Sequence, residues 1–317
     1  MSILPPTPVA IAKAAAVLRA GGLVAFPTET VYGLGADATQ SLAVAAIFSS
    51  KGRPQFNPLI VHTTDIGSAK VLGRFGPLAE LLAAEFWPGP LTLVVPRAEA
   101  CPVALLATAG LSTIALRVPS NPVAAKLLHE AGVPIAAPSA NRSGHVSATR
   151  AEHVQADFGA RLPIILDGGV SQVGLESTVV DACGDRPVLL RAGAVPSRLI
   201  EKICGFELVR AMAGGPYPQS PGQMLSHYAP RARLRLEAEC ARSGEGLLAF
   251  GQTPKNGGGG PVLNLSARSN LIEAAANLFD HLRALDLTGV NCIAVMPIPF
   301  DGLGEAINDR LSRAAWR

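Results

Sequence analysis

Short apolar runs alternate with longer amphipathic segments along most of the chain. Runs of strand length occupy 23–26, 58–62, 91–95, 113–118, 134–137, 163–166, 177–181 and 187–191. Segments with helical spacing of apolar residues occupy 9–20, 39–50, 77–86, 121–131, 149–158 and 196–203. The alternation predicts an α/β layered domain. Because some strands follow one another without a helix between them, the pattern favours a mixed sheet over a fully parallel one.

Residues 211–231 interrupt this pattern, because prolines and glycines cluster there and leave too few apolar residues for a core. The alternation then resumes, with strands predicted at 233–236, 246–250, 262–265 and 292–297 and helices at 271–285 and 303–315. We therefore predict three parts, which are a large α/β domain at 1–209, a linker or lid at 210–232, and a small α/β domain at 233–317.

Composition supports two folded domains. The chain has 317 residues, of which 49% are hydrophobic and 16% are charged, so a sizeable core is expected. The net charge of +3 permits contact with phosphates but is too small to indicate a strong nucleic-acid binder.

Cysteine usage and the N-terminal sequence bear on the cellular compartment. The five cysteines are scattered and include no C-x-x-C pair, which argues for reduced thiols and against disulfides or a zinc site. The N-terminus lacks the charged and apolar regions of a signal peptide, and no apolar run is long enough for a membrane span. We expect a cytoplasmic protein without membrane contact.

Residues 51–62 carry the strongest chemical signal. Lys51 and Arg53 are one residue apart, and prolines at 54 and 58 restrict the backbone around them. We predict that both cations lie on a stiff turn and not on a helix, at the edge of the strand that ends in His62. Lysine and arginine suit phosphate or carboxylate, so an anion site is indicated. An ordinary solvated basic loop remains open as an alternative.

Residues 27–38 are rich in hydroxyl groups and glycine, and they are predicted to form a turn between strand 23–26 and helix 39–50. Gly33-x-Gly35-x-x-Ala38 superficially fits a dinucleotide-binding fingerprint. However, no acidic residue lies between Asp37 and Asp65, where that motif needs a ribose ligand. A dinucleotide site is therefore disfavoured.

The joint pattern of motifs closely resembles the YrdC/Sua5 family of threonylcarbamoyl-adenylate synthases. The matching segments are Pro27-Thr-Glu-Thr-Val-Tyr-Gly-Leu-Gly35, Lys51-x-Arg53-x-x-x-Asn57-Pro-Leu59, Trp87-Pro-Gly-Pro-Leu-Thr92, Ala115-Leu-Arg117-Val-Pro119, Ala137-Pro-Ser-Ala-Asn141, Leu175-Glu-Ser-Thr-Val-Val-Asp181 and Leu190-Arg-Ala-Gly193. Ser220-Pro-Gly222 and His227-Tyr-Ala-Pro230 look like the linker of the long, two-domain Sua5 form. The tail, with Asp309-Arg-Leu311, matches more weakly.

The resemblance implies a YrdC-like twisted mixed sheet with helices, followed by a smaller Rossmann-like Sua5 domain. It implies a nucleotidyltransferase that joins L-threonine, bicarbonate and ATP into threonylcarbamoyl-AMP and expels pyrophosphate. Mg²⁺ would come with ATP and be held mainly through phosphate oxygens. A separate tRNA threonylcarbamoyl transferase machinery would then use the product for the t6A modification of tRNA.

The resemblance also assigns roles to individual residues. Lys51 and Arg53 would be catalytic. Threonine and bicarbonate would be bound by Thr30, His62, Arg117 and Ser177. ATP would be bound by Arg53, Asn57, Thr113, Ser139, Asn141, Ser147, Arg191 and Tyr228. Structural roles stay open beside these, including a surface position for Arg117 and helix capping by Ser147.

Three further hypotheses stay open at this point. His227 and Tyr228, with Ser220-Pro-Gly222, could form a lid that shields a labile adenylate from water. A rival function is a module that binds tRNA or double-stranded RNA without catalysis, with Lys51, Arg53, Arg117 and Arg142 gripping phosphates. A carbamoyl transferase of hydrogenase maturation is a second rival, but the chain lacks an acylphosphatase segment and cysteine clusters of the zinc type.

Overall fold

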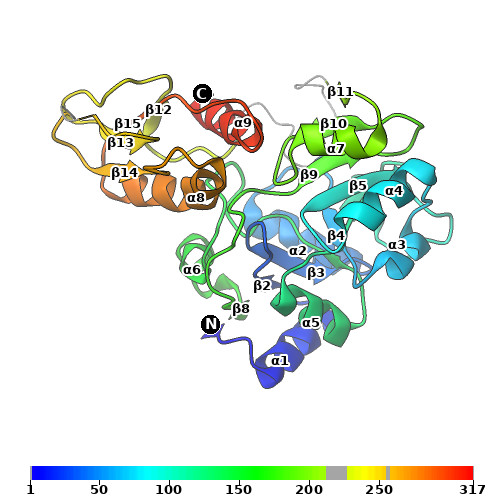
Figure 1. Cartoon of the computed structure of the whole chain (residues 1–317). Coiled ribbons are helices and arrows are strands. Elements are labelled where there is room, and N and C mark those ends of the chain that lie inside the picture. Colours follow the sequence, from blue (N-terminus) through cyan, green and yellow to red (C-terminus); the bar gives the residue numbers. More distant parts are fainter. Residues whose placement is uncertain (1, 212–226, 255–257, 317) are drawn as a thin grey trace.

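The computed structural model describes residues 2–211, 227–254 and 258–316, and the strands in these ranges form two sheets (Figure 1). The larger sheet has eleven strands and the smaller has four. We call residues 2–211 the large unit and residues 233–316 the small unit. The predicted fold class, a mixed α/β sheet followed by a smaller α/β unit, is confirmed.

The large sheet mixes parallel and antiparallel pairs. Its spatial order is β1 (Ser2–Leu4), β8 (Ile164–Leu166), β2 (Val24–Phe26), β3 (Gly33–Asp37), β7 (Ile135–Ala136), β4 (Ile60–His62), β6 (Thr113–Arg117), β5 (Leu91–Pro96), β9 (Thr178–Asp181), β10 (Val188–Arg191) and β11 (Val209–Arg210). β4 runs parallel to β6, and β9 runs parallel to β5 but antiparallel to β10. These pairings bring the ends of β4 and β6 and the start of β9 into one region.

Helices cover both faces of this sheet. They are α1 (Pro8–Arg19), α2 (Ser41–Lys51), α3 (Ile66–Leu72), α4 (Pro77–Phe86), α5 (Pro122–Ala131), α6 (Ala151–Phe158) and α7 (Ser197–Cys204), with short 3₁₀ turns at Leu105–Thr108 and Gly159–Arg161. In β2, Val24 and Phe26 pack toward α1 and α5, whereas Ala25 packs into the cluster on the other side. The alternation of side chains along a strand thus divides the core between two faces.

The sequence around α1 shows why a helix begins there. The Thr7 hydroxyl accepts a hydrogen bond from the N–H of Ala10 at 3.2 Å, and Pro8 lies in the first turn, where a missing N–H is tolerated. Apolar residues then recur at helical spacing, and the buried ones are Ala10, Ile11, Ala14, Ala15 and Leu18. This buried stripe fixes the helix against α5.

The prediction of a turn throughout 27–38 was wrong for β3 (Gly33–Asp37), which is a fully buried strand inside the sheet. Its glycines concealed it, because glycine is usually unfavourable in strands. Here glycine is required, since a Cβ on Gly35 would lie 2.8 Å from the Phe26 ring and 2.9 Å from Ile135. The preceding residues 27–32 do form an irregular turn.

Three other elements were not predicted. β1 and β11 have only three and two residues and depend on partners far away in sequence, while α3 has seven residues. β1 pairs with β8, for example, so that Ile3 lies opposite Ile165. A pattern read within a short window gives no signal for such pairings.

The small unit is a parallel sheet with two helices. The strands lie in the order β12 (Arg233–Arg235), β15 (Cys292–Val295), β13 (Gly246–Ala249) and β14 (Val262–Asn264), and every pairing is parallel. The helices are α8 (Leu271–Leu287) and α9 (Gly304–Ala315). Asn270 caps α8 by accepting hydrogen bonds from the N–H groups of Ile272 and Glu273. The predicted elements of this part therefore all occur, with shifted ends.

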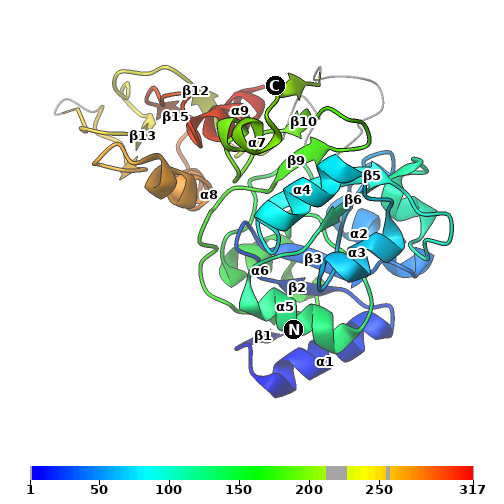
Figure 2. The same ribbon diagram turned by 45° about the vertical axis from the view of Figure 1, so that its right-hand side comes forward.

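The two units share a hydrophobic core. Val31, Val146 and Leu175 of the large unit belong to the same buried cluster as the inward faces of α8 and α9. Figure 2 shows α9 beside α7 and β10, and α8 lies on the side toward α6. The backbones approach closely at Gly174, because a Cβ there would lie 2.4 Å from the carbonyl oxygen of Ala275 in α8. The units are thus packed against each other and are not merely tethered.

Polar contacts reinforce this interface. Between α6 and α8, the Arg283 guanidinium lies 2.6 Å from Asp157, and Arg150 at the start of α6 lies 2.7 Å from Asp280. Near α7, the Ser197 hydroxyl donates to Glu305 of α9. These pairs lie at the rim of the interface and surround the apolar cluster.

The large sheet ends with β11 (Val209–Arg210) and the small sheet begins with β12 (Arg233–Arg235). Residues 212–226, which include most of the predicted linker and the motif at 220–222, lie outside the described residues. The exact domain limits therefore stay a prediction. All five cysteines are free, and the described helices include none with the length and apolar character needed to cross a bilayer.

Candidate active site

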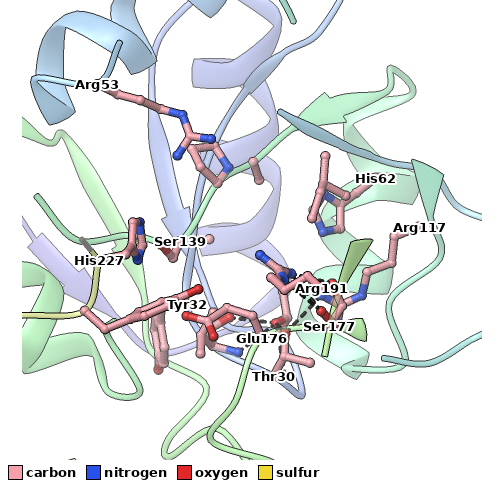
Figure 3. A pocket seen from close by; sticks show the side chains of 17 residues that line it. Thr30, Tyr32, Arg53, His62, Arg117, Ser139, Glu176, Ser177, Arg191 and His227 are labelled. Carbon is pink, nitrogen blue, oxygen red and sulfur yellow. Dashed lines mark hydrogen bonds between the residues drawn. The ribbon is translucent and has the colours of Figure 1, made fainter. Parts of the chain in front are cut away.

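One cavity gathers most of the residues that the sequence singled out (Figure 3). Its predicted lining residues are Thr30, Arg53, His62, Arg117, Ser139, Ser177, Arg191 and Tyr228. It is also lined by Thr28, Val31, Tyr32, Gly33, Ile60, Ala137, Pro138, Glu176 and His227. The walls come from the strand ends of the large sheet and from residues 227–228, which connect to the small unit.

Arg117 closes one end of the cavity and is held on three sides. Its Nε donates to the carbonyl oxygen of Gly89 at 3.2 Å, Nη1 donates to the Thr30 hydroxyl at 3.0 Å, and Nη2 donates to Glu29 at 2.6 Å. The side chain is buried, so the predicted alternative of a surface arginine is wrong. A fixed guanidinium of this kind suits a carboxylate ligand.

Glu29 forms a buried ion pair with Arg117 and helps to fix the position of its guanidinium. Burial alone would raise the pKa of Glu29, but the charge and hydrogen bond of Arg117 outweigh burial and hold that pKa below its ordinary value. The other carboxylate oxygen accepts a hydrogen bond from the N–H of Asn121 at 3.3 Å. Glu29 is therefore an ionised partner of Arg117 and not a proton acceptor waiting in the cavity.

Ser177 and Arg191 form a second bonded group beside Arg117. Nη2 of Arg191 donates to the carbonyl oxygen of Ser177 at 2.8 Å and lies 3.1 Å from its hydroxyl. The Ser177 hydroxyl also lies 2.7 Å from that of Thr92. In Figure 3 these groups and Thr30 gather at one end of the cavity, while Arg53 lies apart from them.

His62 faces the same end and is neutral. It lies opposite Arg117 in the parallel pair of β4 and β6. Burial, and then the charge of Arg117, lower the pKa of His62 to about 3. Its Nδ1 has no hydrogen-bond partner among the described residues, although it is buried. A buried ring nitrogen without a protein partner is suited to a polar ligand.

The turn at 28–32 is held by its own hydroxyl groups. Thr28 donates to the carbonyl oxygen of Val31 at 2.6 Å, and its hydroxyl lies 2.8 Å from that of Thr30. The Tyr32 hydroxyl donates to the carbonyl oxygen of Gly169 at 2.8 Å. Thr28 and Tyr32 belong to the quoted motif but were not predicted as site residues; their hydroxyl groups within that motif are the signal that could have identified them.

The sequence predicted that Lys51 and Arg53 project together from one stiff turn, and this prediction was wrong. Lys51 is the last residue of α2 and not part of a turn, because Gly52 ends the helix with a φ of 62°. Its Nζ donates to the carbonyl oxygens of Ser139, at 2.6 Å, and Asn141. Lys51 therefore holds the segment that carries Ser139, whereas Arg53 reaches the cavity.

Both cations are buried, which rules out the solvated loop. Arg53 donates to the carbonyl oxygens of Asn57 at 3.3 Å and Pro58 at 3.0 Å. Burial, and then the charge of Arg191, lower the pKa of Arg53 to about 10. Burial, and then the charge of Arg53, lower the pKa of Lys51. Concentrated positive charge inside the protein is typical of a site that binds an anion.

Four predicted ATP ligands do not line the cavity in the described structure, namely Asn57, Thr113, Asn141 and Ser147. Thr113 begins β6, at the opposite end from Arg117. The Nδ2 of Asn141 donates to the carbonyl oxygens of Arg142 and His145, which shapes the loop around it. Ser147 donates to Glu176 and does not cap a helix, since α6 begins at Ala151. Their assignment as ATP ligands stays a prediction.

His227 and Tyr228 reach the cavity from the small unit's side. Tyr228 is buried, has a φ of 64°, and stacks on Phe279 of α8 with ring centroids 5.6 Å apart. The His227 ring lies 4.0 Å from that of Tyr228, and burial lowers the pKa of His227 to about 3. The lid prediction is thus tested only in part, because residues 220–222 lie outside the described residues.

Comparison with known proteins adds to this geometry. Residues 16–193 match the Sua5/YciO/YrdC family model, which is described as "Telomere recombination", and residues 195–316 match the model described as "Threonylcarbamoyl-AMP synthase, C-terminal domain". The chain belongs to the Sua5 family. The resemblance inferred from the motifs is confirmed, including its extension to the long, two-domain form.

Relatives of the Sua5 family match nearly the whole chain. Threonylcarbamoyl-AMP synthase of Bacillus subtilis (strain 168) is 42% identical and covers 96% of this chain and 92% of its own. The enzyme of the same name from Pyrococcus abyssi is 42% identical and covers 95% and 93%. The crystal structure of P. abyssi Sua5 complexed with L-threonine has a TM-score of 0.89 at 41% identity and covers 96% of this chain and 94% of its own.

Proposed function

We propose that the chain condenses L-threonine, bicarbonate and ATP into threonylcarbamoyl-AMP and releases pyrophosphate, as a nucleotidyltransferase. The main support is the cavity, which is lined by Thr30, His62, Arg117 and Ser177. The chain is also similar to a Sua5 that was solved in complex with L-threonine. A downstream tRNA threonylcarbamoyl transferase machinery would consume the product for the t6A modification.

The end of the cavity around Arg117 suits threonine. The guanidinium would pair with the substrate carboxylate, since it is buried and fixed by Glu29 and Gly89. The neutral His62 and the hydroxyl groups of Thr30 and Ser177 would bond the polar groups of a small amino acid. Catalysis would rest on positioning and on charge neutralisation, without a covalent nucleophile.

The Arg53 side of the cavity suits the triphosphate. Arg53 lines the cavity directly, and Lys51 fixes the segment of Ser139, which also lines it. The Lys51 ammonium group uses two of its three N–H donors for hydrogen bonds to carbonyl oxygens. The third N–H would be available to a phosphate or to the carboxylated amine. Both residues would stabilise the negative charge that builds up as pyrophosphate leaves.

Mg²⁺ would enter with ATP. Among the described residues that line the cavity, Glu176 is the one with a carboxylate, and its oxygens already accept hydrogen bonds from Ser147 and Arg310. This donor set fits a metal ion held through phosphate oxygens and water, which is how Mg²⁺ is commonly bound. When bound, the ion would neutralise charge on the phosphates.

The RNA-binding rival is not favoured. Lys51, Arg53 and Arg117 are 5%, 8% and 3% exposed, so these cations cannot lie along a phosphate backbone at the surface. Of the four cations proposed for that role, only Arg142 is exposed. Direct contact between tRNA and another part of the chain is a separate question from this cavity.

Pyrophosphate release is the decisive measurement. Purified protein would be incubated with ATP, Mg²⁺ and bicarbonate, with and without L-threonine, while threonylcarbamoyl-AMP is followed by mass spectrometry. We expect release that requires both threonine and bicarbonate. Arg53→Ala should lower kcat/KM by about 100-fold or more, in the range typical for loss of one preorganised charge-stabilising group.

Arg74→Ala is the matched control, because Arg74 is an exposed arginine of the same unit outside the cavity. It should leave the rate unchanged. Pyrophosphate release that ignores threonine, or an Arg53→Ala variant as active as the control, would contradict the proposal.

A further inference from the structure

A fully buried arginine of the small unit reaches the wall of the cavity. Arg310 lies on α9 and is 0% exposed. Its Nε donates to Glu176 at 2.8 Å, and its Nη2 donates to the carbonyl oxygen of Ala192 at 2.9 Å. Its Nη1 lies 2.5 Å from the neighbouring Asp309. Two of its three contacts therefore cross from the small unit to the large one.

Both contacts lie next to residues that line the cavity. Glu176 itself lines it and immediately precedes Ser177, and Ala192 immediately follows Arg191. Ser177 and Arg191 are bonded to each other. Arg310 thus ties together the two segments that carry this bonded pair.

The two segments also lie in close backbone contact at Gly193. A Cβ on Gly193 would lie 2.5 Å from the carbonyl oxygen of Glu176 and 2.5 Å from the N atom of Thr178. The Ser147 hydroxyl holds the second oxygen of Glu176. Arg310 is the charged partner of the other Glu176 oxygen, and without it this buried carboxylate would lose that partner.

Arg310 also contacts a second lining residue, Tyr228. Its guanidinium lies 4.9 Å from the centroid of the Tyr228 ring, within the range of a cation–π interaction. Phe279 of α8, in the small unit, also stacks against Tyr228. One side chain therefore contacts Glu176, Tyr228 and the backbone beside Arg191.

Stability alone does not account for such a residue. A buried ion pair generally contributes no more to stability than well-packed apolar residues of similar volume would, because both charges must be desolvated. If the Arg310–Glu176 pair served only to join the units, apolar side chains at both positions could thus replace it at little cost. Its contacts instead converge on the wall of the cavity.

We propose that Arg310 is a positioning residue for the reaction, contributed by the small unit, which holds Glu176, Tyr228 and the Ser177–Arg191 pair in their working arrangement. The proposal rests on the proposed function for its activity readout. It assigns the small unit a direct part in building the substrate cavity.

Arg310→Met tests this in the full-length chain. Threonine affinity is measured by titration calorimetry, kcat and KM by pyrophosphate release, and thermal unfolding by circular dichroism. We expect a folded variant whose kcat/KM falls by about 100-fold, since small misplacements in a reactive site have effects of that size. The Kd for threonine should rise by at least about tenfold for the same reason.

Arg150→Met is the matched control. It removes a different ion pair between the units, that of Arg150 with Asp280, which does not touch the cavity. We expect its threonine Kd and kcat/KM to remain within about twofold of the unmodified protein, as is usual for partly exposed pairs. An equal loss in both variants would show that Arg310 only joins the units, and would overturn the proposal.

If Arg310→Met does not fold, the variants Arg310→Lys and Glu176→Gln still test the positioning role of Arg310. Lysine retains the charge but cannot match the fork geometry of arginine, so the threonine Kd should still rise by about fivefold to tenfold. Combining Arg310→Met or Arg310→Lys with Glu176→Gln should give losses well below additive, since both residues act through one contact. A threonine Kd equal to that of the unmodified protein in folded Arg310→Lys would refute the proposal.

The threonine Kd and the pyrophosphate release test the positioning role of Arg310 and the proposed function separately. Threonine binding without threonine-dependent pyrophosphate release in the unmodified chain would refute the proposed function while leaving Arg310 testable by Kd. Normal activity and affinity in folded Arg310→Met would refute the positioning role while the proposed function stands.

Discussion

Two buried arginine–glutamate pairs stand on two walls of the same cavity. Arg117 lies 2.6 Å from Glu29, and Arg310 lies 2.8 Å from Glu176. Each glutamate immediately precedes a hydroxyl residue that lines the cavity, Thr30 in one case and Ser177 in the other. Yet the two pairs face opposite ways: the cavity is lined by the cation of the first pair and by the anion of the second.

The pairs also differ in origin. Arg117 and Glu29 both belong to the large unit, whereas the second pair joins α9 of the small unit to the large one. The large unit can therefore present a cation to a substrate carboxylate by itself. To present an ordered carboxylate at Glu176, it needs the small unit. Both units are therefore needed to build the cavity.

The largest effect is expected from Arg117→Met. It removes the cation that faces the ligand and also leaves Glu29 buried without its partner. Threonine binding should weaken by about 2–5 kcal/mol, as when one member of a buried charge pair is truncated. The free energy of unfolding should fall by about 3–5 kcal/mol for the same reason. Calorimetry and urea titration measure the two effects.

Arg97→Met is the control for that variant. Arg97 is a partly buried arginine of the large unit that donates to the carbonyl oxygens of Cys101 and Val103, outside the cavity. It should lose stability without losing threonine affinity. If Arg117→Met bound threonine as well as Arg97→Met does, the first pair would be structural only and the comparison would fail.

A smaller effect is expected from Gly174→Ala, which acts at the contact between the units and should disturb the second pair. Gly174 has a φ of 73°, and a Cβ there would collide with the backbone of α8 at Ala275 and Ala276. We expect the free energy of unfolding to fall by about 1–3 kcal/mol, the usual cost of overpacking, with a rise in the threonine Kd.

Gly184→Ala serves as its counterpart, since a Cβ there meets nothing within 4 Å. It should leave both measurements unchanged. A Gly174→Ala protein with an unchanged threonine Kd, despite reduced stability, would mean that the second pair tolerates displacement of the small unit.

The smallest effect concerns acid stability. Burial alone would raise the pKa of Glu29 and Glu176, but their arginine partners outweigh burial and hold both below the ordinary value of 4.5. A carboxylate with a lowered pKa contributes stability that is complete above its ordinary pKa and is lost as the pH falls through the folded value. The free energy of unfolding should therefore decline below about pH 4.5.

Glu29→Gln and Glu176→Gln should each make that decline shallower, which urea titrations between pH 5 and pH 3 can measure. Glu80→Gln is the reference, because its pair with Lys70 is about half exposed and such pairs contribute little. Slopes equal to those of the unmodified protein in both buried variants would show that neither pair is charged as described.

Much of this arrangement could be read from the sequence, and the exceptions have physical causes. The family resemblance grouped Thr30, His62, Arg117 and Ser177 in one substrate pocket, and the structure places all four on one cavity, where parallel and adjacent strands bring their ends together. β3 (Gly33–Asp37) was missed because close packing against Phe26 selects glycine, which otherwise signals a turn.

The second arginine–glutamate pair could not be predicted at all. Arg310 and Glu176 are separated by 134 residues and lie in different units. On a terminal helix rich in charged residues, Arg310 is indistinguishable by pattern from Arg313, and charged residues on helices are usually solvated. Lys51 was also misplaced. The prolines at 54 and 58 suggested a turn around it, but the helix continues through Lys51 and ends at Gly52.

The position of Arg310 in the chain has a consequence for synthesis. The described lining residues all lie between Thr28 and Tyr228, so a growing polypeptide carries them long before α9 is made. Domains fold from the N-terminal end as units during translation, and the large sheet can form first. The guanidinium that contacts three points of the cavity wall is made after all of the described lining residues. A message cut short before Arg310 would therefore yield a polypeptide that carries these lining residues around an unfinished cavity.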